Sequence, residues 1–502
     1  MAFFLSLVMI MAMGLTVFAE GESTGATYKL TLNGTSEGHT YEAYQIFTGD
    51  LSTDTDGNKV LSNVKWGTGV TYTGTESATD VANKLVDEKD GMTLDQLVGK
   101  LTLTTPVKTV PSAKGSTDIT GLAAGYYLVK DQDGTQTDKS GAYTKFIVQV
   151  VGDTSVGVKS DVPTVEKKVK DTNDSTGITT NWQDSADYDI NDDVQYQITG
   201  TMPNNIADYT IYKYVFTDTM SKGLTYTAGN ATIKIGDTDV TGSFTESVTT
   251  NDNGPTTVTW TCNNLKGIKG VTLDENTKVV VTYTAKLNEN AVIGSAGNPN
   301  TVNLTYSNNP NKVDGGETGK TPDDKNIVFT FKVDVNKVDQ KGTPLAGASF
   351  TLSKVKLDNE GKVLETGVPI KTYELTGDKE KDPTTFTASG LDDGTYVLKE
   401  TKTPTGYNTI ADQYFTIEAT HETTADNPQL TALSGTKLEG SVITFTSEKT
   451  TGSLTTNVVN KEGSTLPSTG GRGTTMIYII GAALVITAGV VLVMRKKMNS
   501  DK

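Results

Sequence analysis

One pattern of turn and strand residues occurs near both ends of the chain, and it restricts the fold more than any other feature. Residues 121–131 read Gly-Leu-Ala-Ala-Gly-Tyr-Tyr-Leu-Val-Lys-Asp, and residues 390–400 read Gly-Leu-Asp-Asp-Gly-Thr-Tyr-Val-Leu-Lys-Glu. Both copies place two glycines around a turn and follow them with the alternation of a strand. Two distant copies of one such unit predict two related β domains, one at each end of the folded region.

The remaining sequence is also typical of β structure. Dipeptides that favour hairpin turns, such as Asn33-Gly34 and Asp133-Gly134, separate short runs rich in Val, Thr and Tyr. Only 77–89 and 92–101 carry the three-and-four spacing of apolar residues that indicates helices. We therefore expect an all-β protein of tandem immunoglobulin-like β-sandwich domains, with a short helical insertion in the first domain.

The organisation of the chain follows from the position of the repeats. A different module separates them, beginning near Pro163, and a Gly/Asp/Lys-rich stretch at 315–326 is typical of a linker into the last domain. We expect five segments, which are 1–19, 20–160, 161–326, 327–463 and 464–502.

Both ends of the chain resemble membrane-targeting segments. An apolar run ends at Ala19, as in a secretory signal peptide cleaved after that residue, although no basic residue precedes the run. At the other end an apolar run at 476–494 is followed by Arg495, Lys496 and Lys497. Its length is near the roughly 20 residues that a membrane-crossing helix needs. The basic residues place the body of the protein outside the cell. The sequence thus predicts a C-terminal transmembrane helix.

Composition excludes several classes of function. The chain carries 60 acidic and 44 basic residues, for a formal net charge of −16, which argues against nucleic acid as a partner. Two histidines, His39 and His421, and the single Cys262 cannot build a zinc, haem or iron–sulfur site. We therefore expect no metal and no cofactor. An enzyme is also not expected, because no nucleophile or phosphate-binding loop stands in a recognisable setting.

Three polar residues each continue the apolar side of a predicted strand in the last domain: Lys337, Glu400 and Asn460. Burial lowers the pKa of a lysine and raises that of a glutamate, so both groups can exist uncharged. A neutral amine is a nucleophile, and a protonated carboxyl polarises an amide carbonyl. The expected product is a Lys–Asn isopeptide bond, formed with loss of ammonia. The alternative is a lysine at a strand end with its ammonium in water.

A family resemblance favours the cross-link. Val335-x-Lys337-x-Asp339, the run Glu-Thr-Lys-Thr-Pro-Thr-Gly-Tyr at 400–407, and Val458-Val459-Asn460 resemble a collagen-adhesin B-type repeat. In such repeats a lysine and an asparagine cross-link themselves with help from a glutamate. The resemblance implies that Lys337 and Asn460 are joined and that Glu400 is catalytic.

The middle module resembles the second domain of Gram-positive backbone pilins through the run Phe-Thr-Asp-Thr-Met-Ser-Lys-Gly-Leu at 216–224. In that domain an aspartate takes the part of the glutamate. The implied triad has catalytic Asp218 and a bond between Lys167, on the valine side of 165–169, and Asn300. Three alternatives stay open for the two cross-linked positions: Lys168, Asn298 and Asn303. A further alternative is that Asp218 is only a turn carboxylate.

The first domain departs from this pattern. Asp131 stands where the last domain has Glu400, but Leu32 occupies the place of the lysine, and no asparagine occurs between 141 and 161. The sequence thus predicts no equivalent cross-link there. The run at 38–47 resembles the N-domain of backbone pilins, which implies that His39 is a surface or packing residue and not a catalyst.

The C-terminal residues resemble the sorting signal of Gram-positive wall-anchored proteins, in which an LPxTG motif precedes an apolar helix and a basic tail. The motif here is Leu466-Pro467-Ser468-Thr469-Gly470. In that family a sortase cleaves between the threonine and the glycine and transfers the threonyl group to an amine. Backbone pilins carry a polymerising lysine at the end of the first domain, which implies Lys159 here, with Lys168 and Lys170 as competitors.

These resemblances imply the structural major subunit of a covalently polymerised pilus, secreted and anchored to the cell wall after transient retention in the membrane. The implied partners are other copies of the chain, pilus-specific and housekeeping sortases, and peptidoglycan, with tip and base pilins and host surface ligands as further partners. The alternative is a monomeric wall-anchored adhesin that binds a host ligand.

Overall fold

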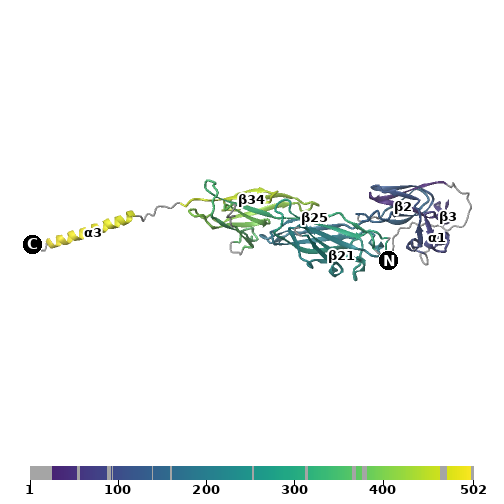
Figure 1. Ribbon diagram of the computed structural model, residues 1–502, viewed down its shortest axis with the longest axis horizontal. Coiled ribbons are helices and arrows are strands. Elements are labelled where there is room, and N and C mark those ends of the chain that lie inside the picture. The colour runs from purple at the N-terminus through teal and green to yellow at the C-terminus, as the bar shows by residue number, and fades with distance from the viewer. Residues whose placement is uncertain are drawn as a thin grey trace.

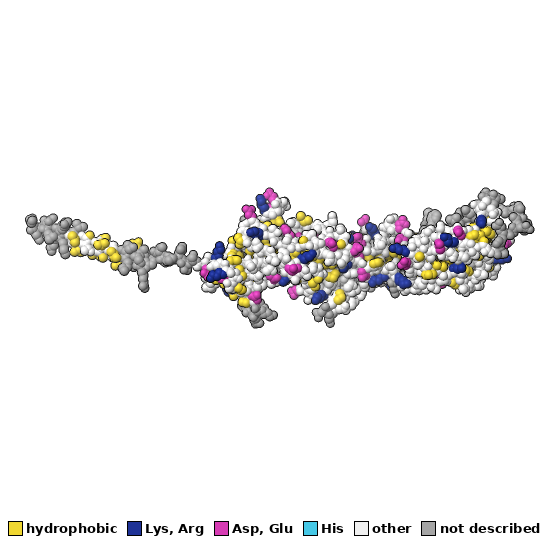
Figure 2. All heavy atoms as spheres, turned by 90° about the horizontal axis from the view of Figure 1, so that it is seen from above, with side chains coloured by type: hydrophobic (Ala, Val, Ile, Leu, Met, Phe, Trp, Pro, Cys, Tyr) yellow, Lys and Arg dark blue, Asp and Glu magenta, His cyan; other side chains and the backbone are white. Residues whose placement is uncertain are grey.

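The computed structural model describes residues 25–53, 57–86, 92, 94–137, 139–158, 161–251, 254–310, 312, 315–364, 369–375, 382–463 and 472–498. Figure 1 shows a row of β bodies that follow one another along the chain, with helix α3 beyond the last. Figure 2 shows acidic and basic side chains interspersed over the visible face. The predicted signal segment 1–19 and the motif at 466–470 lie outside the described residues.

The first body packs the three-stranded sheet β10-β1-β7 and the five-stranded sheet of β3, β2, β8, β9 and β6 around two apolar clusters. The helical insertion predicted in this domain is confirmed as α1 and α2. The elements are β1 (Tyr28–Thr35), β2 (Thr40–Thr53), β3 (Lys59–Trp66), β4 (Val70–Tyr72), α1 (Ala78–Val86), α2 (Leu94–Gly99), β5 (Leu101–Leu103), β6 (Lys108–Pro111), β7 (Gly115–Leu122), β8 (Gly125–Asp131), β9 (Lys145–Val150) and β10 (Thr154–Gly157).

The middle body is a sandwich of a six-stranded sheet containing β11-β15-β22-β18-β19 and a seven-stranded sheet containing β14-β25-β23-β16-β21-β20. Alternating buried residues of these strands form one core. The elements are β11 (Val165–Val169), β12 (Thr172–Asn173), β13 (Ile178–Thr179), β14 (Ser185–Asp187), β15 (Asp193–Thr201), η1 (Ile206–Asp208), β16 (Tyr214–Met220), β17 (Leu224–Tyr226), β18 (Thr232–Ile235), β19 (Thr238–Asp239), η2 (Thr241–Ser243), β20 (Thr245–Thr250), β21 (Thr256–Cys262), η3 (Leu265–Gly267), β22 (Lys278–Leu287), β23 (Asn298–Ser307), β24 (Thr318–Lys320) and β25 (Asp324–Phe329).

The last body packs the four-stranded sheet β29-β26-β34-β33 against the five-stranded sheet β28-β27-β30-β31-β32. Its core is a separate apolar cluster. The elements are β26 (Phe331–Asp339), β27 (Ser349–Lys354), β28 (Lys371–Leu375), β29 (Thr385–Leu391), β30 (Gly394–Lys402), β31 (Gln413–His421), β32 (Leu430–Lys437), β33 (Phe445–Glu448) and β34 (Ser453–Asn460). The all-β, tandem-domain prediction is confirmed.

The two copies of the repeated pattern adopt the same local structure. Gly121 and Gly390, at the turns before β8 and β30, have φ of 72° and 77°, a left-handed conformation that favours glycine. In each copy the tyrosine hydroxyl donates a hydrogen bond to the backbone carbonyl oxygen four residues earlier, at 2.8 Å for Tyr127 and 3.0 Å for Tyr396. The first strand of each domain also pairs in parallel with the last, β1 with β10 and β26 with β34.

The stretch 315–326 is not a linker, contrary to the expectation from its composition. β24 and β25 both pair with β23, because the edge of that long strand offers free backbone groups to them. β25 then continues to Phe329, which packs in the core of the last body, and only Thr330 separates β25 from β26. The middle and last bodies are therefore joined strand to strand.

The C-terminal segment forms helix α3 (Arg472–Met498), which Figure 1 shows extending away from the β bodies. Among the described residues no helix is both long enough and apolar enough to cross a membrane. The transmembrane helix predicted at 476–494 is not found among these residues. Side chains of the helix are described only over 478–491, a stretch shorter than the roughly 20 residues that a crossing requires.

Candidate cross-linking sites

The structure brings together the three residues that the sequence singled out in the middle domain. Lys167 lies on β11 of one sheet, while Asp218 on β16 and Asn300 on β23 face it from the other sheet. Asp218 pairs with Val302 and Asn300 with Met220, so the carboxylate and the amide are diagonal neighbours on the inner face. All three side chains are fully buried.

A tyrosine hydroxyl connects the three groups. Lys167 Nζ lies 2.6 Å from Asp218 Oδ1 and donates to the Tyr283 hydroxyl at 2.6 Å. That hydroxyl donates to Asp218 Oδ2 at 2.5 Å and accepts a hydrogen bond from Asn300 Nδ2 at 2.8 Å. Burial raises the pKa of Tyr283 well above its ordinary value, so its proton stays available to the carboxylate.

The environment favours an uncharged amine on Lys167. Burial lowers the pKa of Lys167, and the nearby Asp218 carboxylate opposes this effect only in part. The amine also lies 5.0 Å from the ring centre of Tyr196 and 5.1 Å from that of Tyr283, which stack on each other. Aromatic walls exclude water from the lysine, whose amine contacts the Asp218 carboxylate and the Tyr283 hydroxyl.

The neighbouring residues that the sequence left open are engaged elsewhere. Lys168 forms ion pairs with Asp184 and Glu166 at 2.6 and 3.1 Å. Asn298 uses both ends of its amide on backbone groups of Val292. Asn303 donates to Asp323 Oδ1 at 3.1 Å in an exposed setting.

The structure adds one competitor that sequence reasoning missed. Asn326 on β25 pairs directly with Asn300 and is fully buried. Within the described part of the chain neither its Oδ1 nor its Nδ2 has a hydrogen-bond partner. Its place opposite Asn300 makes it the proper control in any test of the cross-link.

In the last domain the three predicted residues also converge, with a different distribution between the sheets. Lys337 on β26 and Asn460 on β34 lie in adjacent parallel strands, where Lys337 pairs with Val458 and Asp339 with Asn460. Glu400 on β30 faces them from the opposite sheet. Lys337 and Asn460 are fully buried, and Glu400 is 5% exposed.

Glu400 holds the asparagine in this site. Asn460 Nδ2 donates to both carboxylate oxygens, at 2.9 and 3.1 Å. Glu400 Oε2 also accepts from the Thr403 hydroxyl and the Ile410 backbone N–H, each at 3.2 Å. The Lys337 amine donates to the Val458 and Val338 carbonyl oxygens. Burial lowers its pKa to about 8, although the Glu400 charge acts in the opposite direction.

The two sites share one feature that sets their asparagines apart. Asn300 and Asn460 both donate through Nδ2 into the site, and neither Oδ1 accepts a hydrogen bond from the described residues. A buried carbonyl left unpaired costs about 1–3 kcal/mol. The carbonyl oxygen that must be polarised during amide exchange is therefore left free in both sites.

In the first domain the described residues at the matching positions do not form such a triad. Leu32 on β1 is fully buried opposite Val156 on β10, in the register that Lys337 has opposite Val458. Asp131 instead pairs with His39 Nδ1 at 2.8 Å and accepts the Thr144 backbone N–H at 2.6 Å. His39 is thus a buried structural partner.

The residues predicted to join one chain to the next are only partly visible. Lys159 and the whole motif Leu466, Pro467, Ser468, Thr469 and Gly470 lie outside the described residues. The structure does describe the two competing lysines. Lys168 is held in its two ion pairs, and the Lys170 amine lies 5.0 Å from the ring centre of Trp182.

Sequence reasoning also missed Tyr283 and Tyr196. The alternation of 278–287 turns Val279, Val281 and Tyr283 toward the same side, so a tyrosine on a buried face was visible in the sequence. A buried phenol requires a hydrogen-bond partner. That signal predicts a polar neighbour but cannot name it, because the partner comes from the opposite sheet.

Three family models match parts of the chain. The Gram-positive pilin backbone subunit 2, Cna-B-like domain matches 190–310, the prealbumin-like fold domain matches 331–429, and the LPXTG cell wall anchor motif matches 458–502. They confirm the resemblances to pilin domains and to a wall-sorting signal.

One curated relative and two solved structures are similar to this chain. The trypsin-resistant surface T6 protein of Streptococcus pyogenes serotype M6 is 25% identical over 409 residues, which cover 69% of this chain and 71% of that protein. The solved T6 backbone pilin has a TM-score of 0.53 at 19% identity and covers 88% of this chain and 100% of that structure. The major pilin SpaD of Corynebacterium diphtheriae has a TM-score of 0.49 at 20% identity over 87% of this chain and 98% of that structure. The T6 likeness supports the three-body fold.

The lowered pKa of Lys337 predicts a pH-dependent stability in a chain that cannot react, such as Asn460→Ala. Between about pH 8 and its ordinary pKa of 10.5, the unfolded chain binds a proton at Lys337 that the folded chain does not. The free energy of unfolding should therefore rise with pH in this window, by at most about 1.4 kcal/mol per pH unit. Urea unfolding followed across the window measures the slope. Asn460→Ala combined with Lys337→Met is the control and should lose this slope; an equal slope in both chains would contradict the assignment.

The missing lysine and asparagine of the first domain predict an order of durability. The 25–158 region should be the first part of the chain cut by protease and the first to melt, because no covalent bond closes its β1–β10 pair. Limited proteolysis with mass identification of the fragments, together with calorimetry, measures the order. Loss of the last domain while the first remains whole would show the reverse.

Proposed function

We propose that this chain, a homologue of the Gram-positive backbone pilins that carries their LPXTG wall anchor, is the major subunit of a sortase-polymerised pilus on the cell surface. The carrying observation is the order of the matches, in which a backbone-pilin domain and a prealbumin-like domain precede the anchor motif. The chain serves as structural material and as the substrate of sortases. Its other partners are further copies of itself and the peptidoglycan.

The middle site forms a Lys167–Asn300 isopeptide bond without any other enzyme. The neutral Lys167 amine attacks Cγ of Asn300, the new C–N bond forms, and the original C–N bond of the amide breaks. The amine proton goes to the leaving nitrogen, which departs as ammonia. Asp218 carries that proton, and Tyr283 acts as a positioning residue, since its hydroxyl contacts both Asp218 and Asn300.

The last site forms a Lys337–Asn460 bond by the same exchange of amide for ammonia. Glu400 takes the part of Asp218, and its two oxygens already contact the amide nitrogen that leaves. The bond would tie the first and last strands of the domain, which are parallel neighbours. By analogy with a disulfide that closes a loop of about 100 residues, such a tie stabilises the folded domain by roughly 4–5 kcal/mol.

The polymer bond joins Thr469 of one subunit to the Lys159 amine of the next. Thr469 follows the last domain, while the residues on either side of Lys159 belong to the end of β10 and the approach to β11. Linking these points stacks copies head to tail, a heterologous contact that does not close and so gives an open filament. Lys168 and Lys170 are poorer acceptors because their amines are already engaged.

The internal bonds predict a mass deficit. The folded ectodomain should be lighter than its sequence by two molecules of ammonia, one from each site. Asp218→Ala and Glu400→Ala should each restore one of them, because the attacking amine then has no carboxyl to move its proton. Intact-mass spectrometry of the folded chain and tandem spectrometry of its peptides give the number and place of the bonds.

Two variants make this test specific. Lys168→Ala and Asn326→Ala alter the nearest alternative amine and amide, and both should retain the full deficit. A chain with the plain sequence mass would refute the internal bonds. A deficit lost in Asn326→Ala but retained in Asn300→Ala would move the middle bond to the other asparagine.

The polymer bond predicts a ladder of high-mass species when wall extracts are run on a denaturing gel. Lys159→Ala should abolish the ladder and leave monomer attached to the wall through Thr469, since wall attachment uses a different amine. Lys168→Ala and Lys170→Ala serve as matched controls and should keep it. A ladder that survives every one of these changes would place the acceptor elsewhere, and a wild-type chain without any ladder would favour a monomeric wall-anchored protein.

A further inference from the structure

The joint between the middle and last bodies buries an unusual number of carboxylates. Main-chain contacts close this joint, since Asp184 N donates to the Thr423 carbonyl oxygen and Ile190 N to that of Gly390. Among the described residues, seven acidic side chains and three basic ones meet here, so the joint has a formal excess of negative charge. They are Asp171, Asp174, Asp187, Asp189, Asp192, Asp392 and Asp393, with Lys354, Lys371 and His421.

The three basic residues are not evenly distributed among these aspartates. Lys354, which is fully buried, contacts Asp392 directly and lies 2.9 Å from Asp189 Oδ2. Lys371 lies 3.7 Å from Asp192 Oδ1. The half of the joint around Asp189 and Asp392 is thus supplied with ammonium groups, whereas the half around Asp171 and Asp187 has only an imidazole.

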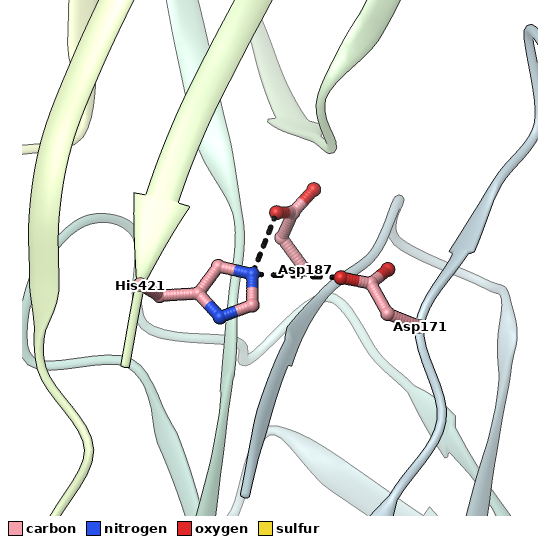
Figure 3. A group of neighbouring side chains, drawn as sticks. All are labelled: Asp171, Asp187 and His421. Atoms are coloured by element: carbon pink, nitrogen blue, oxygen red, sulfur yellow. Dashed lines mark ion pairs between the residues drawn. The ribbon is translucent and has the colours of Figure 1, made fainter. Parts of the chain in front are cut away.

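That imidazole faces two carboxylates from the other domain. His421 ends β31 in the last domain, Asp187 ends β14 in the middle domain, and Asp171 follows β11. Figure 3 shows His421 Nε2 directed at both acids, and each Nε2–Oδ2 distance is 3.4 Å. The side chains of His421 and Asp187 are 8% and 1% exposed, and that of Asp171 is 15% exposed.

A second contact fixes the orientation of the ring. His421 Nδ1 lies 2.6 Å from the Ser185 hydroxyl, and that hydroxyl donates to the Glu422 carbonyl oxygen at 2.6 Å. The hydroxyl oxygen therefore accepts the proton of Nδ1, which leaves Nε2 to face the two carboxylates. Histidines that bind metals are held in the same way, by donation from their other nitrogen.

An independent observation is an unpaired carboxylate oxygen in the aspartates that adjoin this half of the joint. Asp392 is 1% exposed, and within the described residues its Oδ2 has no hydrogen-bond partner. Asp392 and Asp393 each offer an oxygen within 4.8 Å of one from Asp187, the carboxylate that also faces His421. The other oxygen of Asp392 contacts Lys354, so Asp187 and Asp393 add negative charge beside an ammonium that is already shared.

We propose that Asp171, Asp187 and His421 form a binding site for one divalent transition-metal ion, with Zn²⁺ as the best match, at the joint between the two domains. Imidazole nitrogen and carboxylate oxygen are ligands that Zn²⁺ accepts at about 2.0–2.2 Å. Two ligands at about 2.0–2.1 Å on a tetrahedral ion are about 3.3–3.4 Å apart, which matches the Nε2–Oδ2 spacing. The fourth position would be left to water.

The counting of His and Cys residues in the sequence missed this site because two of its three ligands are carboxylates. The two aspartates are 16 positions apart, and His421 follows more than 200 positions later. The three side chains meet only when the domains dock, and no local motif records such a meeting. An ion bound there would hold β31 of the last domain to β14 of the middle domain. The bound state should therefore resist separation of the two domains better than the metal-free state.

Zinc titration of the tag-free full chain, stripped with a chelator and followed by calorimetry and elemental analysis, tests the proposal. We expect one Zn²⁺ per chain, tighter binding of Zn²⁺ than of Ca²⁺, and a higher Tm with the ion. His421→Gln should weaken Zn²⁺ binding at least tenfold. His39→Gln is the matched control, because it changes the one other histidine, also buried and also paired with an aspartate, and it should bind as the wild type does.

Asp171→Asn provides a second variant at the more exposed edge of the site, for use if His421→Gln does not fold. It should also weaken binding at least tenfold while keeping the circular dichroism of the wild type. The proposal is overturned if the wild-type chain binds no stoichiometric Zn²⁺, if only Ca²⁺ binds, or if folded His421→Gln and Asp171→Asn bind as tightly as His39→Gln. The first of these results would mean that a proton on His421, shared with the two carboxylates, occupies the space instead.

Discussion

The desolvation of a lysine amine is the constraint on which both cross-linking sites depend. An ammonium group taken out of water must be paired, neutralised or consumed. The three fully buried lysines discussed above answer this in different ways. Lys354 contacts two aspartates and stays an ion, whereas Lys167 and Lys337 have fewer acidic neighbours and pKa values lowered by burial. The number of carboxylates in contact with each amine thus distinguishes Lys354 from the two lysines of the proposed cross-links.

The proposed reaction would take place in two different arrangements of the sandwich. In the middle domain the carboxylate and the amide share a sheet and the lysine lies opposite, while in the last domain the lysine and the amide share a sheet and the carboxylate lies opposite. Both sites bring together a buried amine, a buried carboxylate and a buried amide whose carbonyl oxygen has no hydrogen-bond partner among the described residues. The proposed chemistry would therefore depend on the local environment and not on the order of the strands.

Much of this could be predicted from sequence because strand alternation is local. Alternate residues of a strand face the same side of its sheet, which predicts that Lys337, Glu400 and Asn460 point into the core. Comparison of the two repeats predicts that Leu32 takes the place of the lysine in the first domain. What alternation cannot give is the residue that faces a site from another sheet or another domain. Tyr283, Asn326 and His421 reach their positions through tertiary packing, and the linker expected at 315–326 was wrong because composition does not reveal a free strand edge.

The single residue between β25 and β26 has a mechanical consequence. Thr330 is buried and its hydroxyl donates to the Leu391 carbonyl oxygen, so even this one residue is fastened to the last domain. Rotating one domain relative to the other would break the hydrogen bonds that pair β25 with β23 or those that pair β26 with β29. This joint therefore transmits torque as a rigid coupling, and a filament of such subunits would store rotation elsewhere along its length.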